Sequence, residues 1–144
     1  MSTSTVLCMD AGQSGIRTQV RVDGRIMAEF ETSGVLTDRP LNPQLATAAG
    51  DALRASAGVE SAPRTVAIGS TGLDDRADAA ALLDLLAAFG VTEVFLAHDS
   101  ITSYLGALGD EPGAVVAAGT GVVTLAVGER RVQRVDGWGY LIGD

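Results

Sequence analysis

Residues 6–30 read VLCMDAGQSGIRTQVRVDGRIMAEF, and the order of strands and turns in this stretch determines how the chain begins to fold. The apolar run at residues 6–9 predicts a short buried strand. After a glycine-bearing turn, Thr18, Val20 and Val22 alternate with longer polar side chains, which predicts a second strand. The dipeptide that follows, Asp-Gly, is a strong hairpin signal, and an apolar strand returns after it. The stretch therefore predicts three consecutive antiparallel strands.

Helices and strands alternate after these three strands. Residues 41–58 carry apolar side chains at helical spacing, with Asn42 as the expected N-cap and Pro43 as the first helical residue. The further expected elements are a strand (65–68), a helix (76–89) closed by Gly90, a strand (91–97), a helix (100–108) and three strands after residue 113. This order predicts an α/β layered domain.

The composition disfavours several classes of protein and several kinds of partner. The chain has 144 residues, 47% of them hydrophobic, which is enough for a packed core. Its net charge of -8 disfavours a nucleic-acid partner, although small phosphorylated ligands can still be held by backbone N–H groups. No apolar run reaches the length of a membrane span, and the start of the chain lacks a signal-peptide pattern. Cys8 is the only cysteine and is expected in the core, so we expect a cytoplasmic protein without an internal disulfide.

The first glycine-bearing turn is a candidate phosphate site. Gly12, Gln13, Ser14 and Gly15 form a turn whose N–H groups and hydroxyl can face an anion. Asp10, just before it, could hold Mg²⁺ directly or through water. An ordinary hairpin turn remains the alternative, and no P-loop pattern is present.

A second turn of the same kind lies between two apolar strands. Gly119, Thr120 and Gly121 again place a hydroxyl between glycines, and a tight hairpin is again the alternative. The two turns together suggest a clamp that grips a polyphosphate from two sides. Because strand, turn and strand recur here, a related structural unit is expected to begin near Gly113.

Two further stretches carry candidate substrate residues. Asp99 follows a buried strand, where a carboxylate can take a proton from a hydroxyl that attacks a phosphoryl group; a helix N-cap is the alternative. The sequence GWGYLIGD closes the chain. Trp138 between Gly137 and Gly139 offers a flat face for a sugar ring, and Asp144 can accept hydroxyl hydrogen bonds. A buried Trp in a strand–loop core is the alternative there.

In this order, the four stretches resemble the sugar kinases of the ASKHA superfamily, which share the actin-like ATPase core. The likeness is to the N-acetylglucosamine kinases and the wider BadF/BadG/BcrA/BcrD ATPase family. Residues 10–16 resemble the first phosphate loop of type D-G-G-G-T, and His98-Asp99 matches the N-D pair whose Asp is the catalytic base. The G-T-G of residues 119–121 matches the second phosphate loop. Residues 137–144 match the sugar segment G-W-G-x-x-x-G-D.

The resemblance implies a ribonuclease H-like lobe at residues 1–112 and the first strands of a second lobe at 113–144, truncated inside the sugar segment. It implies ATP and Mg²⁺ as cofactors and phosphorylation of an amino sugar, N-acetylglucosamine or glucosamine. Asp99 would act as base, Asp10 would organise Mg²⁺, and both turns would hold the phosphates. Since both lobes must close on the nucleotide, we expect the 144-residue chain alone to have little or no kinase activity.

Some positions depart from the family pattern. Gln13 replaces a Gly and His98 an Asn, and the early Asn that touches the sugar has no clear counterpart, although Asp38 and Asn42 lie nearby. Two alternatives follow: a non-catalytic sugar-sensing or regulatory module, or an ATPase activator of a radical enzyme, for which one cysteine cannot supply the cluster ligands. We expect small-molecule partners, a sugar and a nucleotide, and neither nucleic acid nor membrane. Exposed strand edges would favour self-association, for example a homodimer.

Overall fold

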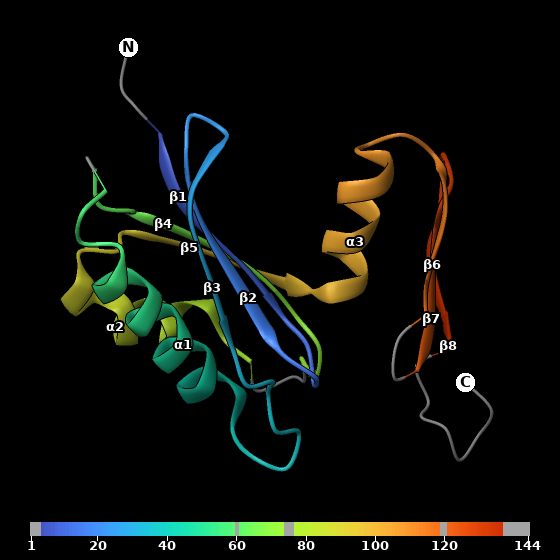
Figure 1. The fold of residues 1–144 in the computed structure, drawn as a ribbon. Coiled ribbons are helices and arrows are strands. Elements are labelled where there is room, and N and C mark those ends of the chain that lie inside the picture. The colour runs from blue at the N-terminus through green and yellow to red at the C-terminus, as the bar shows by residue number, and fades with distance from the viewer. Residues whose placement is uncertain (1–3, 60, 74–76, 119–120, 137–144) are drawn as a thin grey trace. The chain divides into compact units, whose positions relative to one another are not determined.

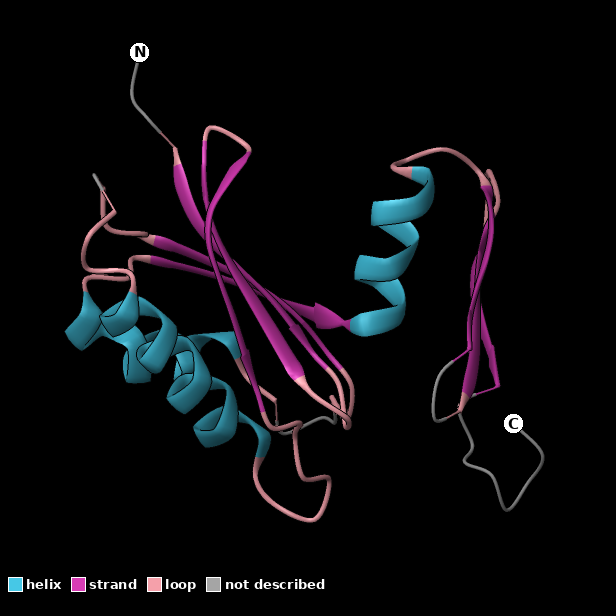
Figure 2. Cartoon of the chain, viewed as in Figure 1, coloured by secondary structure: helices cyan, strands magenta, loops and turns pink. Residues whose placement is uncertain are grey.

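The computed structural model describes residues 4–59, 61–73, 77–118 and 121–136. They form two compact units, Met1–Ala97 and His98–Asp144, and each contains its own sheet (Figure 1). Helices and strands alternate between residues 41 and 118, and strands alone lie before and after this part (Figure 2). The predicted α/β class is therefore confirmed, and the predicted lobe boundary at residues 112/113 stays a prediction.

The first unit contains a five-stranded sheet in the order β3-β2-β1-β4-β5. Its strands are β1 (Thr5–Ala11), β2 (Ile16–Val22), β3 (Arg25–Thr32), β4 (Thr65–Ser70) and β5 (Glu93–His98). The first three are antiparallel, as predicted, and β4 runs parallel to β1. The predicted Asp-Gly hairpin joins β2 and β3, with φ values of 47° at Asp23 and 80° at Gly24, so both central residues take the positive φ of a type I′ turn.

Helices α1 (Leu41–Ala55) and α2 (Ala79–Leu86) pack against each other on one face of this sheet (Figure 1). Side chains that alternate along β1 point into the core between the sheet and the helices: Leu7, Met9 and Ala11. Leu45 of α1 and Leu82 of α2 are fully buried in the same core. A single 3₁₀ turn (Ala87–Phe89) extends α2, and Gly90 closes it with a φ of 82°, as predicted.

The predicted N-cap of α1 was wrong. The helix begins at Leu41, with Pro40 at the cap position and no capping side chain, so Asn42 is already inside the first turn. Its Nδ2 atom donates instead to the carbonyl oxygen of Asp78, 2.8 Å away. Gln44 holds the preceding loop in place of a cap: its Oε1 accepts from Leu36 N at 2.8 Å, and its Nε2 donates to the carbonyl oxygens of Leu36, Arg39 and Pro40.

The second unit contains α3 (Asp99–Leu108) and the strands β6 (Gly113–Ala118), β7 (Val122–Val127) and β8 (Val132–Asp136). The three strands form an antiparallel sheet in sequence order, as β1, β2 and β3 do in the first unit. Helix α3 packs against β6 and β7 through Tyr104, whose hydroxyl donates to the carbonyl oxygen of Glu111. The predicted recurrence of antiparallel strands after residue 113 is therefore present. None of the described helices is long and apolar enough to cross a membrane.

Candidate functional site

The first candidate element is the glycine turn between β1 and β2. The N–H group of Gly12 donates to the carbonyl oxygen of Gly15 at 3.0 Å, which closes the turn. Gln13 and Ser14 at its tip are exposed. Asp10 is exposed just before the turn and lies on the sheet face opposite the helices, because Met9 and Ala11 on either side of it point into the core. Asp10, Gln13 and Ser14 are therefore accessible to a ligand, whereas Gly12 and Gly15 are half-buried.

The fold does not require the two glycines of this turn. A Cβ atom on Gly12 would meet its nearest described neighbour, the Gly15 carbonyl oxygen, at 3.4 Å, and one on Gly15 would meet the Thr32 carbonyl oxygen at 3.5 Å. Both distances are ordinary van der Waals contacts, and neither glycine has a left-handed φ. Packing therefore does not account for the glycines, which are the residues that let a ligand come closest to main-chain N–H groups.

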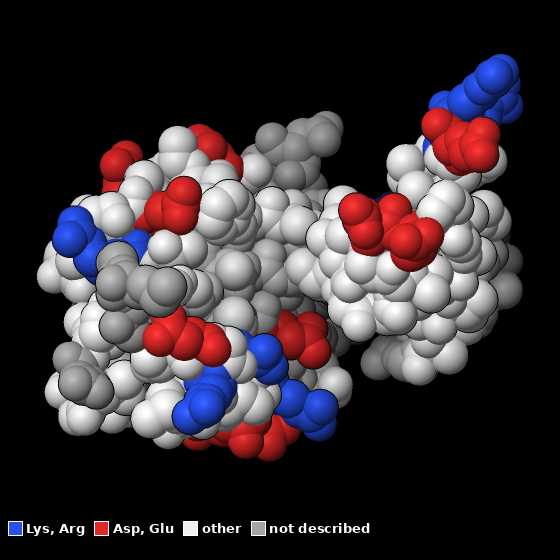
Figure 3. Space-filling model, turned by 90° about the horizontal axis from the view of Figure 1, so that it is seen from above, with Lys and Arg blue, Asp and Glu red and all other residues white. Residues whose placement is uncertain are grey.

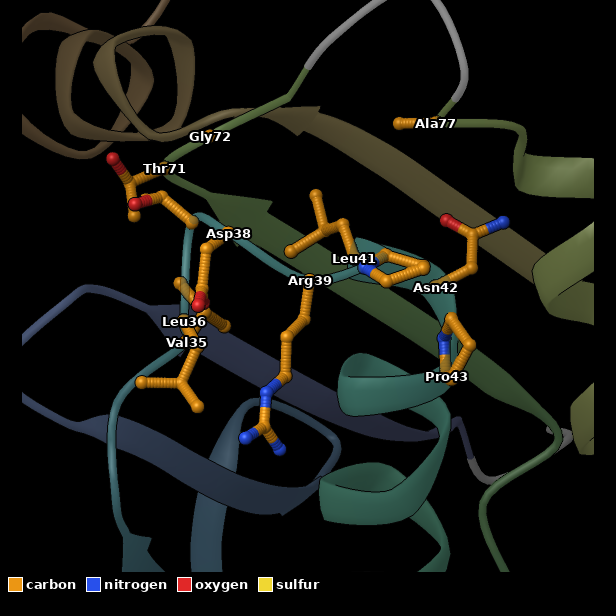
Figure 4. A pocket seen from close by; sticks show the side chains of 12 residues that line it. Val35, Leu36, Asp38, Arg39, Leu41, Asn42, Pro43, Thr71, Gly72 and Ala77 are labelled. Atoms are coloured by element: carbon orange, nitrogen blue, oxygen red, sulfur yellow. The ribbon is translucent and has the colours of Figure 1, made fainter.

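A hollow of about 280 Å³ lies next to the residues that hold this turn: among its lining residues, Val35 donates its N–H to the carbonyl oxygen of Gly12 and Thr71 to that of Ala11. Figure 4 shows that its lining comes from the loop after β3, the start of α1 and the segment after β4. The lining residues are Val35, Leu36, Thr37, Asp38, Arg39, Pro40, Leu41, Asn42, Pro43, Thr71, Gly72 and Ala77. Because β1, β3 and β4 run in the same direction, the glycine turn and both walls of the hollow lie at one edge of the sheet, the edge where open α/β sheets bind ligands.

The sequence patterns did not predict a ligand site at the hollow. They left Asp38 and Asn42 unassigned, and the structure places both in the lining. Asp38 is exposed, and none of the described residues pairs with its carboxylate, whereas Asn42 is tied to Asp78 through its Nδ2 atom. Thr71 and Gly72, which sequence reasoning took only as a loop, form the opposite wall. Their position directly after a buried parallel strand was the signal that could have marked them.

In the second unit, the predicted base Asp99 is the first residue of α3. The structure does not support a capping role for it, because the N-cap is His98: its Nδ1 atom accepts from Ser100 N at 3.2 Å. The same Nδ1 atom lies 2.8 Å from Oδ1 of Asp99, whose side chain is 34% exposed. The Asp99 carboxylate is therefore partly open to solvent in the first turn of a helix, and the Nδ1 atom that accepts from Ser100 has no proton to donate to it.

The capping role of His98 can be checked directly. We expect His98→Ala to lower the free energy of unfolding of the second unit by about 0.5–2 kcal/mol, because the N–H group of Ser100 loses its acceptor. His98→Asn should retain most of the stability, since Asn is among the preferred N-caps. Thermal unfolding followed by circular dichroism measures both. Equal stability of the alanine variant and the wild-type chain would show that the cap contributes nothing.

The other predicted site residues lie at or outside the described part of the chain. Gly121 immediately precedes β7, and the two strands around the second turn pair with Ala118 opposite Val122. Gly119 and Thr120, and the sugar-segment residues Gly137, Trp138, Gly139 and Asp144, lie outside the described residues. The first turn and the hollow belong to one unit, and Asp99 and Gly121 belong to the other.

Charged side chains offer few sites for a metal. Among the described residues, no three His, Cys, Asp or Glu side chains gather where they could hold an ion. The single carboxylate of Asp10 nevertheless fits Mg²⁺, which commonly takes one or two carboxylates and fills its other positions with water and phosphate oxygens. On the face drawn in Figure 3, acidic and basic side chains are interspersed over the described residues, without a continuous basic surface.

Cys8 differs from its expected place in the core. It lies half-buried on β1, on the opposite face of the sheet from the main core. Burial raises the pKa of its thiol, and the nearby charge of Arg21 offsets part of that rise. A raised pKa keeps the thiol protonated at neutral pH, so Cys8 is poorly suited to act as a nucleophile.

Solved structures of sugar kinases share this architecture. A protein from Chromobacterium violaceum described as a candidate N-acetylglucosamine kinase is 26% identical, with a TM-score of 0.71 over 95% of this chain and 50% of its own. A protein of the same description from Porphyromonas gingivalis has a TM-score of 0.77 at 23% identity, over 96% of this chain and 50% of its own. A ROK hexokinase from Thermus thermophilus has a TM-score of 0.59 at 23% identity, over 89% of this chain and 47% of its own.

The chain has the actin-like ATPase fold of the sugar kinases. The resemblance drawn from the four sequence stretches is thereby confirmed at the level of the fold. The chain spans about half the length of the sugar kinases that it matches. No protein-family model and no curated protein sequence matches it.

Proposed function

We propose that this chain carries the sugar site and both phosphate-binding turns of an ATP-dependent kinase that phosphorylates an amino sugar, N-acetylglucosamine or glucosamine. The observation that carries the proposal is the hollow, two of whose lining residues are hydrogen-bonded to the strand end that begins the glycine turn, both at one edge of the sheet. Its volume of about 280 Å³ is at the small end of ligand pockets, which suits one sugar ring better than an oligosaccharide. The likeness to a candidate N-acetylglucosamine kinase at 26% identity supports the choice of an amino sugar.

Each group has a role in this reaction. Asp38 and Thr71 line the hollow and would hydrogen-bond the hydroxyl groups of the sugar. Ser14 and the backbone of the first turn, with Thr120 of the second turn, would hold the β- and γ-phosphates. Asp99 would accept the proton of the sugar hydroxyl as its oxygen attacks the γ-phosphorus and the bond to the leaving ADP breaks.

Asp10 would hold Mg²⁺ through water, and the ion supplies positive charge that offsets the charge of the phosphates. Gly137, Trp138, Gly139 and Asp144 complete the proposed sugar contacts. The partners proposed are small molecules only, a sugar and a nucleotide.

Calorimetry on the 144-residue chain tests the proposal. We expect both N-acetylglucosamine and ATP-Mg²⁺ to bind. Asp38→Asn should weaken sugar binding about tenfold, because a hydrogen bond to a charged acceptor is lost, and should leave nucleotide binding unchanged. Asp84→Asn is the matched control, since Asp84 is exposed on α2 away from the hollow.

The outcomes separate the candidates. A chain that binds sugar but not ATP-Mg²⁺ would be a sugar-sensing or regulatory module, the alternative that Gln13 in the first turn favours. A chain that binds neither ligand would contradict the proposal.

The last glycine of the first turn gives a separate prediction. We expect Gly15→Ala to leave the fold intact, with a free energy of unfolding unchanged or raised by up to about 1 kcal/mol, because the position tolerates a Cβ atom. ATP-Mg²⁺ binding should fall about tenfold, since the new methyl group occupies the space through which phosphate approaches the backbone. Unchanged nucleotide affinity, measured by calorimetry, would remove this turn from the phosphate site.

A further inference from the structure

Gly34, two residues after the end of β3, lies against the first glycine turn. A Cβ atom on Gly34 would be 2.0 Å from the carbonyl oxygen of Gln13, 2.3 Å from its carbonyl carbon and 2.7 Å from the carbonyl oxygen of Gly12. All three are backbone atoms, which cannot rotate out of the way as a side chain can. Real Cβ atoms do not approach other heavy atoms so closely, so any other residue at position 34 must move one of the two backbones.

The segment that begins at Gly34 continues as one wall of the hollow. The N–H group of Val35 donates to the carbonyl oxygen of Gly12 at 3.0 Å. The next residue, Leu36, is held by Gln44 of α1 through hydrogen bonds at its N–H group (2.8 Å) and its carbonyl oxygen (3.0 Å). Both Val35 and Leu36 line the hollow. The segment therefore joins the glycine turn at one end to the hollow and α1 at the other.

The opposite wall is attached to the same strand end. The N–H group of Thr71, which lines the hollow, donates to the carbonyl oxygen of Ala11 at 2.9 Å. Ala11 and Gly12 are consecutive residues at the junction of β1 and the turn. Their two carbonyl oxygens therefore hold one wall each, so a shift of the turn must stretch or break hydrogen bonds on both sides of the hollow.

We infer that Gly34 is a positioning residue: by seating the loop after β3 directly on the first glycine turn, it fixes the shape of the turn and the width of the hollow together. The identity of the ligands rests on the proposed function. In that function, a sugar in the hollow and a nucleotide at the turn both act on the backbone at the end of β1. A change made by either ligand then alters the affinity for the other by the same factor.

Nuclear magnetic resonance on the ¹⁵N-labelled 144-residue chain tests the inference without any ligand. Gly34→Ala should shift the amide signals of the turn (residues 12–15) and of both walls (Val35 and Thr71) together. Gly58→Ala is the matched control, because Gly58 is exposed after α1, has no described atom within 4 Å of a Cβ and lacks a left-handed φ. It should shift only its own neighbours. Signals of the turn or of either wall that stay in place in folded Gly34→Ala would overturn the inference.

Ligand binding provides a second readout. Gly34→Ala should weaken both N-acetylglucosamine and ATP-Mg²⁺ about fivefold to tenfold, the effect of about one lost hydrogen bond at each ligand. Loss of affinity for only one of them would contradict a shared support. If the wild-type chain binds neither ligand, the proposed function fails, whereas the amide signals of the variant still decide the role of Gly34.

The wild-type chain itself keeps the inference testable if the variant does not fold. Saturating N-acetylglucosamine should then slow hydrogen exchange at Val35 and Thr71 and shift the signals of residues 12–15. Exchange and signals that do not change while the sugar is bound in the hollow would show that the hollow and the turn are independent.

Discussion

If the proposed kinase function holds, replacing Asp99 by asparagine is expected to lower the turnover number for sugar phosphorylation by about 10²–10⁴-fold. The amide has nearly the same size as the carboxylate and can stay beside His98 in the first turn of α3, but it cannot accept a proton. The Michaelis constant for the sugar should change little, because the substitution removes an interaction that matters in the transition state. Steady-state kinetics with ATP-Mg²⁺ and N-acetylglucosamine measure both constants.

Asp110→Asn is the control for this experiment. Asp110 is exposed in the turn after α3, so the same change of charge there should leave turnover unaffected. General base catalysis contributes at least about a hundredfold to turnover. A fall of less than about tenfold for Asp99→Asn would therefore be too small for the loss of a general base. Asp99 would then be a residue of the helix start and not a catalytic group.

Replacing Leu82 by alanine is expected to have the largest effect on stability. Leu82 of α2 is 0% exposed in the core of the first unit, and removing its side chain should lower the free energy of unfolding by about 2–5 kcal/mol. Because small domains are stable by only about 5–15 kcal/mol, this loss is a large share of the total. Urea unfolding followed by circular dichroism measures it.

Leu85→Ala on the same helix provides the matched control. Leu85 is 49% exposed, so its removal should change the free energy of unfolding by no more than about 0.5 kcal/mol. The two variants lose the same atoms from one helix and differ only in burial. Equal destabilisation by both would mean that the face of α2 assigned to the core is wrong.

Much of the fold followed from local patterns in the sequence. The Asp-Gly hairpin, the helical spacing of the leucines in α2 and the glycine after its last turn each depend on neighbouring residues, so the sequence predicted them. The start of α1 did not follow, because Asn42 has the composition of a cap but its amide bonds to Asp78, a contact between segments far apart in the chain. Capping rules consider only neighbouring residues, so they do not include a distant partner such as the carbonyl oxygen of Asp78.

The candidate site was predictable only where one segment carries it. The first glycine turn and the carboxylates near it stand out as residue types in a fixed spacing. The hollow is assembled from the loops after β3 and β4 and the start of α1, so it exists only once strand order and direction are known. The need for glycine at position 34 also depends on the folded arrangement. The atoms that exclude a side chain there belong to Gly12 and Gln13, in the turn between β1 and β2.

The central claim is that the hollow holds a sugar ring directly beside the first phosphate-binding turn. The most direct measurement is a titration of the ¹⁵N-labelled chain with N-acetylglucosamine, followed by the same titration with ATP-Mg²⁺. We expect the sugar to shift the amide signals of Thr37, Asp38, Thr71 and Gly72, and the nucleotide to shift those of residues 12–15. If the amide signals of the hollow stay unchanged up to the solubility limit of the sugar, the hollow is not the sugar site. The same conclusion follows if these signals shift only together with signals from other parts of the chain.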